Sequence, residues 1–192
     1  MSHEIVLFHH AQGLTSGVVA FADALRRAGN TVHTPDLYGQ RTFMSINDGV
    51  SHAEEIGFPE IIARGERAVE ALPEEIVYMG ISLGVLPAQK LAQTRAGARG
   101  AVLLSACIPY EEFSEVWPED VAVQIHGMTD DPFFAEEGDL DAAHRLIDVV
   151  ADARLLLYPG NRHLFMDSSS PDYDRDATAL LLQRVLSFVS RH

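Results

Sequence analysis

Cysteine and basic side chains are scarce in this chain of 192 residues. Cys107 is the only cysteine, which excludes a disulfide within the chain and favours a reducing, cytoplasmic location. Lys and Arg number 14 against 28 Asp and Glu, and the formal net charge is −14. Nucleic acids and anionic membrane surfaces attract clustered basic residues, which this chain lacks, so we expect neither as a partner. The acidic residues are dispersed, as on a solvated surface, and indicate little about a substrate.

Long apolar runs and linker-like stretches are missing as well. The first apolar segment is only about six residues long, too short for a signal-peptide core or a membrane span. The longest linker-like stretch, residues 167–172, is better explained as a loop. Nothing divides the chain, and its hydrophobic content of 47% is enough for one core, so we expect a single domain over residues 1–192.

Apolar, strand-like segments alternate with segments of helical period along the chain. Such alternation is typical of parallel βαβ units. It predicts an α/β fold with a minimal, doubly wound, mostly parallel sheet of about six strands, helices on both faces and no large cap. We expect strands at residues 5–8, 31–34, 75–79, 101–105, 121–126 and 154–158, and helices at residues 18–27, 58–72, 83–94, 139–150 and 173–190.

The motif Gly80-Ile81-Ser82-Leu83-Gly84 follows the third predicted strand and precedes a helical segment. A G-x-S-x-G sequence at such a position is typical of a nucleophile elbow, a sharp strand-to-helix turn that holds a serine at its apex and leaves no room for side chains nearby. The pattern alone arises by chance in about one chain in fifteen of this length. A glycine-flanked serine in an ordinary tight turn is therefore the alternative that the rest of the chain has to exclude.

Partners for Ser82 are expected at the carboxyl ends of other strands, where reactive groups gather in open parallel sheets. Asp130 and Asp131 follow the fifth predicted strand, and His163 follows the sixth. A serine hydroxyl needs a base with a pKa near neutrality, which imidazole supplies, and a carboxylate fixes the tautomer of that imidazole. We expect His163 as the base and Asp131 as its partner, because Pro132 fixes the backbone that follows. Asp130 remains an alternative, since adjacent loop residues face different directions.

Four segments form a recognisable set: Thr34-Pro35-Asp36-Leu37-Tyr38, residues 80–84, residues 126–133 with their Asp-Pro pair, and Tyr158-Pro159-Gly160 followed by His163-Leu164-Phe165. Together they resemble the dienelactone hydrolase family of the α/β-hydrolase fold, and the resemblance covers nearly the whole chain. The resemblance and the chain order Ser, Asp, His imply a triad of Ser82, Asp131 and His163 that hydrolyses a carboxylic ester or lactone without a cofactor or metal. Family members use a cysteine nucleophile where this chain has Ser82, which implies a general esterase rather than a true dienelactone hydrolase.

The amides that would hold an oxyanion are expected beside the elbow. The N–H of Leu83 begins the segment after the serine, and the loop after the first strand supplies a second donor in this topology. Comparison with the family favours the Ala11 N–H as that donor, with Gln12 as the alternative. His9 and His10 are not expected to bind a metal, because adjacent residues of an extended chain point to opposite sides.

The side chains that would recognise a substrate are less well marked. Aromatic residues in loops at the presumed active edge are candidates for an apolar pocket, and arginines are candidates for binding a substrate carboxylate. Without a cap, the pocket is expected to be shallow and to suit small esters. The candidates are Tyr38, Phe43, Trp117, Phe133, Phe134 and Phe165 for the pocket, and Arg41 and Arg162 for a carboxylate.

Other functions are left open by these patterns. A thioesterase or another acyl hydrolase would keep the triad and change only the pocket, and a non-catalytic ligand-binding protein would keep the scaffold with attack blocked. Dinucleotide binding is disfavoured: Asp36 follows the second strand, but no G-x-G-x-x-G follows the first. We expect a small-molecule ester or lactone as partner and either a monomer or a homodimer. Cys107 is expected to be a small, buried apolar residue.

Overall fold

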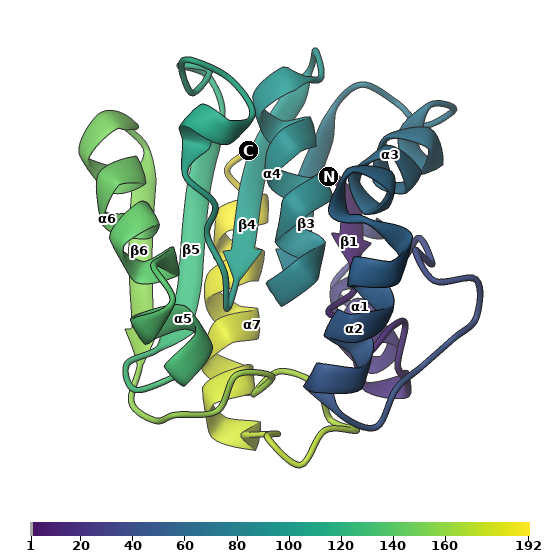
Figure 1. Ribbon diagram of the computed structural model, residues 1–192. Coiled ribbons are helices and arrows are strands. Elements are labelled where there is room, and N and C mark those ends of the chain that lie inside the picture. Colours follow the sequence, from purple (N-terminus) through teal and green to yellow (C-terminus); the bar gives the residue numbers. More distant parts are fainter. Residues whose placement is uncertain (1) are drawn as a thin grey trace.

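The computed structural model describes residues 2–192, which contain one sheet of six parallel strands. The strand order is β2-β1-β3-β4-β5-β6, so the chain winds outward from β1 in both directions. Parallel neighbours need crossover connections, which the helices supply (Figure 1). Open sheets of this kind bind ligands at the carboxyl ends of the strands where the winding reverses. The strands are β1 (Glu4–Phe8), β2 (Thr31–His33), β3 (Ile76–Ile81), β4 (Ala98–Leu104), β5 (Ala122–Met128) and β6 (Ala153–Tyr158).

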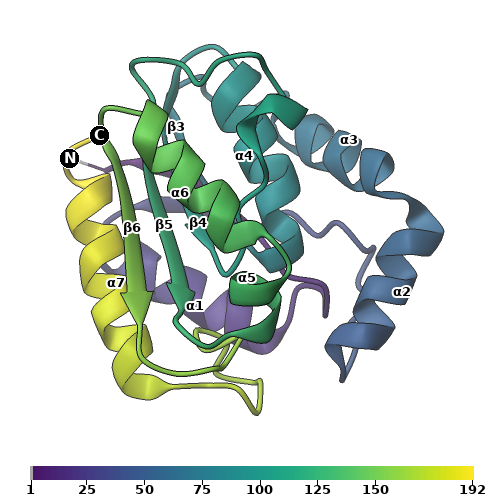
Figure 2. The ribbon, with the colours of Figure 1, turned by 60° about the vertical axis from the view of Figure 1, so that its left-hand side comes forward.

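Helices cover both faces of the sheet (Figures 1 and 2). α1 and α7 lie on one face, whereas α4 packs on β3 and β4 from the other, with α3 against α4 and α6 against β6. Within residues 2–192, no helix combines the length and the apolarity that a membrane span requires. The helices are α1 (Ser16–Arg27), α2 (Ile46–Ile56), α3 (Phe58–Val69), α4 (Val85–Thr94), α5 (Pro132–Glu136), α6 (Asp139–Val149) and α7 (Arg175–Val189), with single 3-10 turns at Ser82–Gly84 and Tyr110–Glu112.

The hydrophobic core forms two layers, one on each face of the sheet. Successive residues of a strand point to opposite faces, so Val6 and Phe8 enter one layer and Ile5 and Leu7 enter the other. β3 is buried at every position. A central parallel strand that helices cover on both faces has a nearly continuous apolar sequence. This explains the apolar sequence of β3, which precedes the elbow.

The predicted α/β class, six strands and helices on both faces are confirmed, and two expectations need correction. The sheet is entirely rather than mostly parallel. The sequence pattern also misses α2 and α5. Both carry start signals, since Ser45 accepts the Asp48 N–H at the start of α2 and Asp131 caps α5. Gly49 in the middle of α2 and the shortness of α5 weaken the periodic signal.

Candidate active site

The turn after β3 holds Ser82 in a backbone conformation that serine rarely adopts. Its φ is 49°, in the left-handed region. A Cβ on Gly80 would lie 2.3 Å from the carbonyl oxygen of Gly84, and a Cβ on Gly84 would lie 2.4 Å from the carbonyl oxygen of Phe8. The absence of a side chain at Gly80 therefore lets the turn close, and its absence at Gly84 lets β1 approach the turn. Backbone contacts thus account for the G-x-S-x-G spacing.

Three polar side chains from three strand ends lie in one hydrogen-bonded row. His163 Nε2 is 2.8 Å from Ser82 Oγ, and His163 Nδ1 is 2.7 Å from Asp131 Oδ2. Asp131 is fully buried, and His163 is 5% exposed. A carboxylate beside Nδ1 keeps a proton on that nitrogen, so the Nε2 lone pair faces the serine hydroxyl. This is the arrangement that a general base needs.

The two adjacent carboxylates after β5 differ in what they contact. Asp131 Oδ1 accepts the Phe133 N–H at 3.0 Å where it caps α5, which leaves Oδ2 for His163. Asp130 is exposed, and its carboxylate accepts the hydroxyl of Thr129 at 3.0 Å. Of the two alternatives, it is Asp131 whose carboxylate lies against the imidazole.

Ser105, at the end of β4, supports the histidine through its backbone. The Ser105 hydroxyl donates to the His163 carbonyl oxygen at 2.7 Å, and its N–H donates to the His126 carbonyl oxygen at 2.7 Å. Its φ of 57° turns the chain sharply after the strand. Phe133 packs against the imidazole, with ring centroids 4.7 Å apart. The sequence pattern does not single out Ser105, although its place at a central strand end was a usable signal.

The two amides expected to hold an oxyanion belong to residues that line the cavity beside Ser82. These residues are Leu83, directly after the serine, and Ala11, in the loop after β1. Gln12, the alternative donor, directs its N–H to His10 Nδ1 at 3.2 Å. Its amide is therefore already engaged, which makes the Ala11 amide the better candidate.

Ser82 and His163 open into a cavity of about 490 Å³ at the carboxyl edge of the sheet. One wall is α2 with the start of α3, and the other runs from α5 to the start of α6; Figure 1 shows α2 and α5 on either side of this edge. Most of the lining is apolar, as expected for a small-molecule site. The lining residues are Ala11, Ile46, Asn47, Val50, Phe58, Ser82, Leu83, Leu86, Ser105, Ala106, Ile108, Phe133, Glu137, Asp139 and His163.

Two carboxylates, and no Lys or Arg, are among the described residues that line this cavity. Burial raises the pKa of Asp139 to about 6, and Glu137 adds to the rise, while the Cys107 N–H and His163 oppose it. Asp139 is therefore mostly ionised at pH 7. Like charges repel more strongly in a partly buried site than in water, so these two carboxylates oppose the binding of an anion in the cavity.

Several side chains predicted to bind the substrate lie elsewhere, which corrects the sequence-based prediction. Tyr38 is buried behind α2, where its hydroxyl donates to the Gly49 carbonyl oxygen at 3.2 Å. Phe165 is buried in the core layer beneath α1 and α7, and Arg41 is exposed. Phe133 alone of the four main candidates lines the cavity, because aromatic residues near strand ends mostly fill the core. Phe43, Trp117, Phe134 and Arg162 are also absent from the lining.

Four other polar or reactive side chains considered in the sequence are explained by their structural contacts or their burial: His9, His10, Asp36 and Cys107. His9 Nε2 accepts the Leu37 N–H at 2.9 Å, and His10 contacts a different loop. In the part of the chain that the structure describes, no group of three or more His, Cys, Asp or Glu side chains is arranged to hold a metal. Asp36 accepts two backbone N–H groups of the turn that follows it. Cys107 is buried, and burial raises the pKa of its thiol, which makes it a poor nucleophile.

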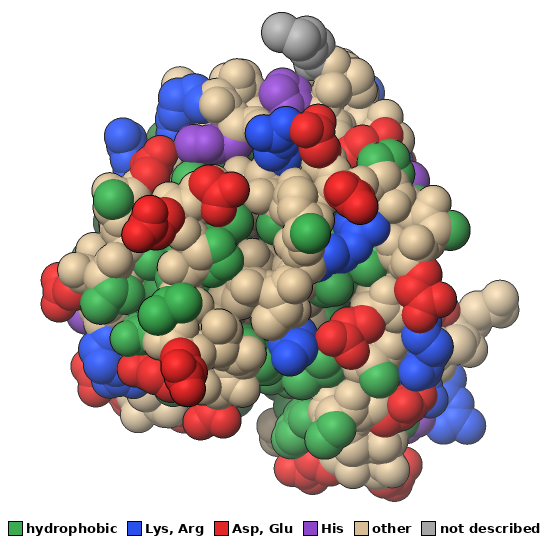
Figure 3. Space-filling model, turned by 90° about the horizontal axis from the view of Figure 1, so that it is seen from above, with side chains coloured by type: hydrophobic (Ala, Val, Ile, Leu, Met, Phe, Trp, Pro, Cys, Tyr) green, Lys and Arg blue, Asp and Glu red, His purple; other side chains and the backbone are tan. Residues whose placement is uncertain are grey.

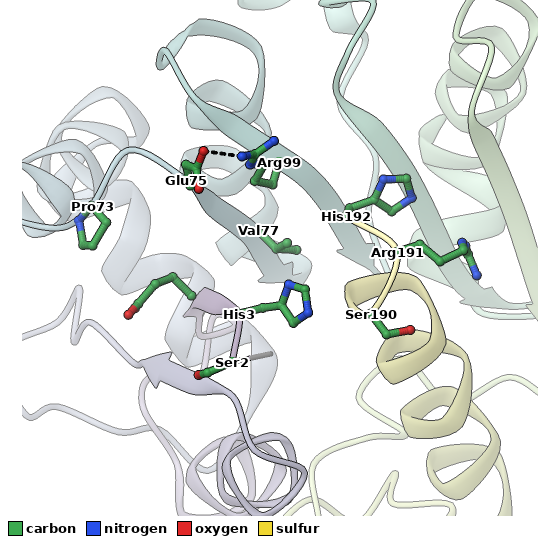
Figure 4. Close-up of a pocket in the computed structure, with 10 residues that line it drawn as sticks. Ser2, His3, Pro73, Glu75, Val77, Arg99, Ser190, Arg191 and His192 are labelled. Atoms are coloured by element: carbon green, nitrogen blue, oxygen red, sulfur yellow. Dashed lines mark hydrogen bonds and ion pairs between the residues drawn. The ribbon is translucent and has the colours of Figure 1, made fainter.

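A second cavity of about 490 Å³ lies at the amino edge of the sheet (Figure 4), and Ser82, Asp131 and His163 are not among its lining residues. Its lining includes His3 and His192, and Arg99 is ion-paired with Glu75 within it. Figure 3 views this side of the molecule and shows acidic and basic side chains interspersed. None of its described lining residues forms a hydrogen bond between a hydroxyl and an imidazole like that between Ser82 and His163, so the carboxyl edge is the candidate site.

Comparisons with known proteins agree with this architecture. The model of the dienelactone hydrolase family matches residues 2–192. A search of curated proteins found no match. A dienelactone hydrolase-like promiscuous phosphotriesterase from metagenomic libraries aligns with a TM-score of 0.72 at 21% identity, over 98% of this chain and 86% of that one. A dienelactone hydrolase from Anabaena variabilis aligns with a TM-score of 0.68 at 14% identity, over 100% of this chain and 87% of that one. The thioesterase domain from the curacin biosynthetic pathway aligns with a TM-score of 0.66 at 13% identity, over 96% of this chain and 91% of that one. At these identities the structural likenesses show the fold alone.

Proposed function

This chain belongs to the dienelactone hydrolase family of the α/β-hydrolase superfamily, and we propose that it is a serine hydrolase that cleaves small carboxylic esters or lactones. The observation that carries the proposal is the row from Asp131 through His163 to Ser82, with contacts of 2.7 and 2.8 Å, at the mouth of an open cavity. A serine in hydrogen-bond reach of an imidazole that a carboxylate orients is an activated nucleophile.

The proposed reaction has two halves that use the same groups. Ser82 Oγ attacks the ester carbonyl carbon while His163 Nε2 takes its proton, and the oxyanion accepts hydrogen bonds from the Leu83 and Ala11 amides. The C–O bond to the leaving alcohol breaks as His163 returns the proton to that oxygen, which leaves an acyl-enzyme. Water then attacks the acyl carbon with His163 as base, and the acid and free Ser82 are released. Asp131 stabilises the imidazolium in both halves.

The cavity supports a narrower substrate class within this reaction. Its volume of about 490 Å³ and its apolar walls suit small acyl and alcohol groups. Glu137 and Asp139 line it without a compensating Lys or Arg. We therefore propose that neutral esters are better substrates than esters that carry a carboxylate or lactones that carry a carboxylate.

Labelling with a fluorophosphonate probe tests the proposal, because the probe reacts with a serine only where a base activates it. We expect the wild-type chain to be labelled at Ser82 and the Ser82→Ala variant to remain unlabelled. A folded wild-type protein that resists the probe would overturn the hydrolase proposal and favour a non-catalytic binding protein.

A substrate panel then separates the candidate reactions. It contains a neutral aryl ester, the same ester with a carboxylate on its acyl chain, a lactone, an acyl thioester and a phosphotriester. The last two are included because similar structures are described as a thioesterase domain and a promiscuous phosphotriesterase. We expect the highest kcat/KM for the neutral ester, and a clear preference for the thioester would replace esterase by thioesterase.

A further inference from the structure

Asp167 carries a buried carboxylate that the proposed reaction does not use. It is 1% exposed and lies in the loop that carries His163. Its Oδ2 accepts hydrogen bonds from His10 at 2.7 Å and from the Thr15 hydroxyl at 2.5 Å, and its Oδ1 accepts the N–H and the hydroxyl of Ser169 at 2.7 and 2.6 Å. Burial by itself would raise the pKa of Asp167, but these hydrogen bonds outweigh it and hold the pKa well below its usual range.

The contact between Asp167 and His10 fixes the tautomer of the imidazole. His10 Nδ1 accepts the Gln12 N–H at 3.2 Å, so the ring proton resides on Nε2, which donates it to Asp167. The bond joins residues 157 positions apart in sequence. A buried imidazole that is hydrogen-bonded to a buried carboxylate is thus found at His10 as well as at His163.

His10 supplies the carbonyl of the peptide unit whose N–H belongs to Ala11. That carbonyl oxygen accepts two hydrogen bonds, from His9 Nδ1 at 2.8 Å and from the Gly13 N–H at 3.0 Å. The C=O and N–H of a trans peptide point in opposite directions, so fixing the carbonyl also aims the Ala11 N–H. His10 is thus anchored twice, through its carbonyl within the loop and through its imidazole to Asp167.

We propose that the His10–Asp167 pair positions the Ala11 amide as an oxyanion donor, by locking the loop after β1 to the loop that carries His163. His10 and Asp167 are positioning residues that act through the backbone of Ala11 and do not touch the substrate. The inference rests on the proposed function, since an oxyanion donor matters only if Ser82 attacks a carbonyl.

The Asp167→Asn variant tests this role. The new amide presents its NH2 group either to the Nε2–H of His10 or to the Ser169 N–H, so in each orientation one hydrogen bond that holds the two loops becomes a contact between two donors. We expect kcat for a neutral aryl ester, per site titrated with the fluorophosphonate, to fall about 10- to 100-fold with KM changed by less than about two-fold. A role in stability alone would lower the melting temperature and the titratable fraction but leave kcat per site unchanged.

Two further variants complete the experiment. Glu4→Gln is the matched control, because it removes the carboxylate from the His33–Glu4 contact of 2.8 Å, at the other end of β1, and should leave kcat unchanged. His10→Asn keeps an acceptor near the position of Nδ1 and removes the bond to Asp167, so it should lower kcat in the same way, and it decides the matter if Asp167→Asn does not fold. Unchanged kcat per site in the folded variants would overturn this inference alone, whereas a wild-type chain that the probe does not label would overturn the proposed function and this inference with it.

Discussion

Asp130 and Asp131 are neighbours in sequence, but of the two only Asp131 contacts His163. The Asp131→Asn variant presents an amide to Nδ1 and so favours the tautomer in which Nε2 carries the proton and cannot accept one from Ser82. We expect kcat for a neutral ester to fall by about 10³- to 10⁴-fold, and the exposed Asp130→Asn control to change it by less than about two-fold. The reverse order of the two variants would show that the carboxylate assignment is wrong.

Asp139 gives a prediction about stability and pH. Its pKa of about 6 in the folded chain lies above the value of about 4 expected for an unfolded chain, so the folded state binds this proton more tightly. Between these two pH values the free energy of unfolding therefore falls as the pH rises. Above both values it stays lower by the full cost of ionising the partly buried carboxyl group.

Asp139→Asn removes this titration. When the pH is raised from 4 to 7, the free energy of unfolding of the variant should increase by about 1–2 kcal/mol relative to that of wild type. This figure already allows for the partial exposure of Asp139, which weakens the effect. Urea denaturation of both proteins at the two pH values measures this. A difference between the proteins that stays constant with pH would contradict the assigned pKa.

At the scale of secondary-structure elements, α2 shows how a wall of the cavity is held in place. Gly49 lies in the middle of this helix, and a Cβ there would lie 2.0 Å from the carbonyl oxygen of Ala11. Alanine is the better helix former by about 1 kcal/mol, but it would push α2 away from the loop that carries the Ala11 amide.

We therefore expect Gly49→Ala to destabilise the protein by about 1–3 kcal/mol and to lower kcat/KM for esters. Ser51→Ala, on the exposed side of the same helix, is the control and should change neither quantity appreciably. Thermal unfolding and ester kinetics measure both effects, and a Gly49→Ala variant more stable than wild type would contradict the close packing of α2.

The elements that the sequence predicts are those whose pattern records burial against the central sheet. β3 is apolar because helices cover both its faces, and the elbow follows from backbone contacts that only glycine permits. α2 buries only Gly49 and Ala53, so its apolar face is too small to stand out. The direction of a loop side chain depends on contacts with distant segments, which is why His163 could be predicted from a strand end but the burial of Tyr38 and Phe165 could not.

At the scale of the whole molecule, the net charge of −14 produces a negative field that reaches beyond single contacts. For an ester with a carboxylate, kcat/KM should rise by about two-fold or more as ionic strength increases from about 0.01 M to about 0.1 M, because the screening length falls from about 30 Å to about 10 Å. For the neutral ester it should stay nearly constant, and this serves as the control. Equal responses of the two esters would mean that the field does not reach the cavity.

Ser82 and His163 are 81 positions apart in the sequence, and His163 and Asp131 are 32 positions apart. The contact between His10 and Asp167 joins residues 157 positions apart. During synthesis, a nascent chain that has already folded its first three strands displays the serine without its base and with the loop after β1 still unanchored. The proposed reaction therefore requires the last strand and the loop after it. If the proposed reaction is correct, ester hydrolysis should appear during refolding no earlier than the docking of β6.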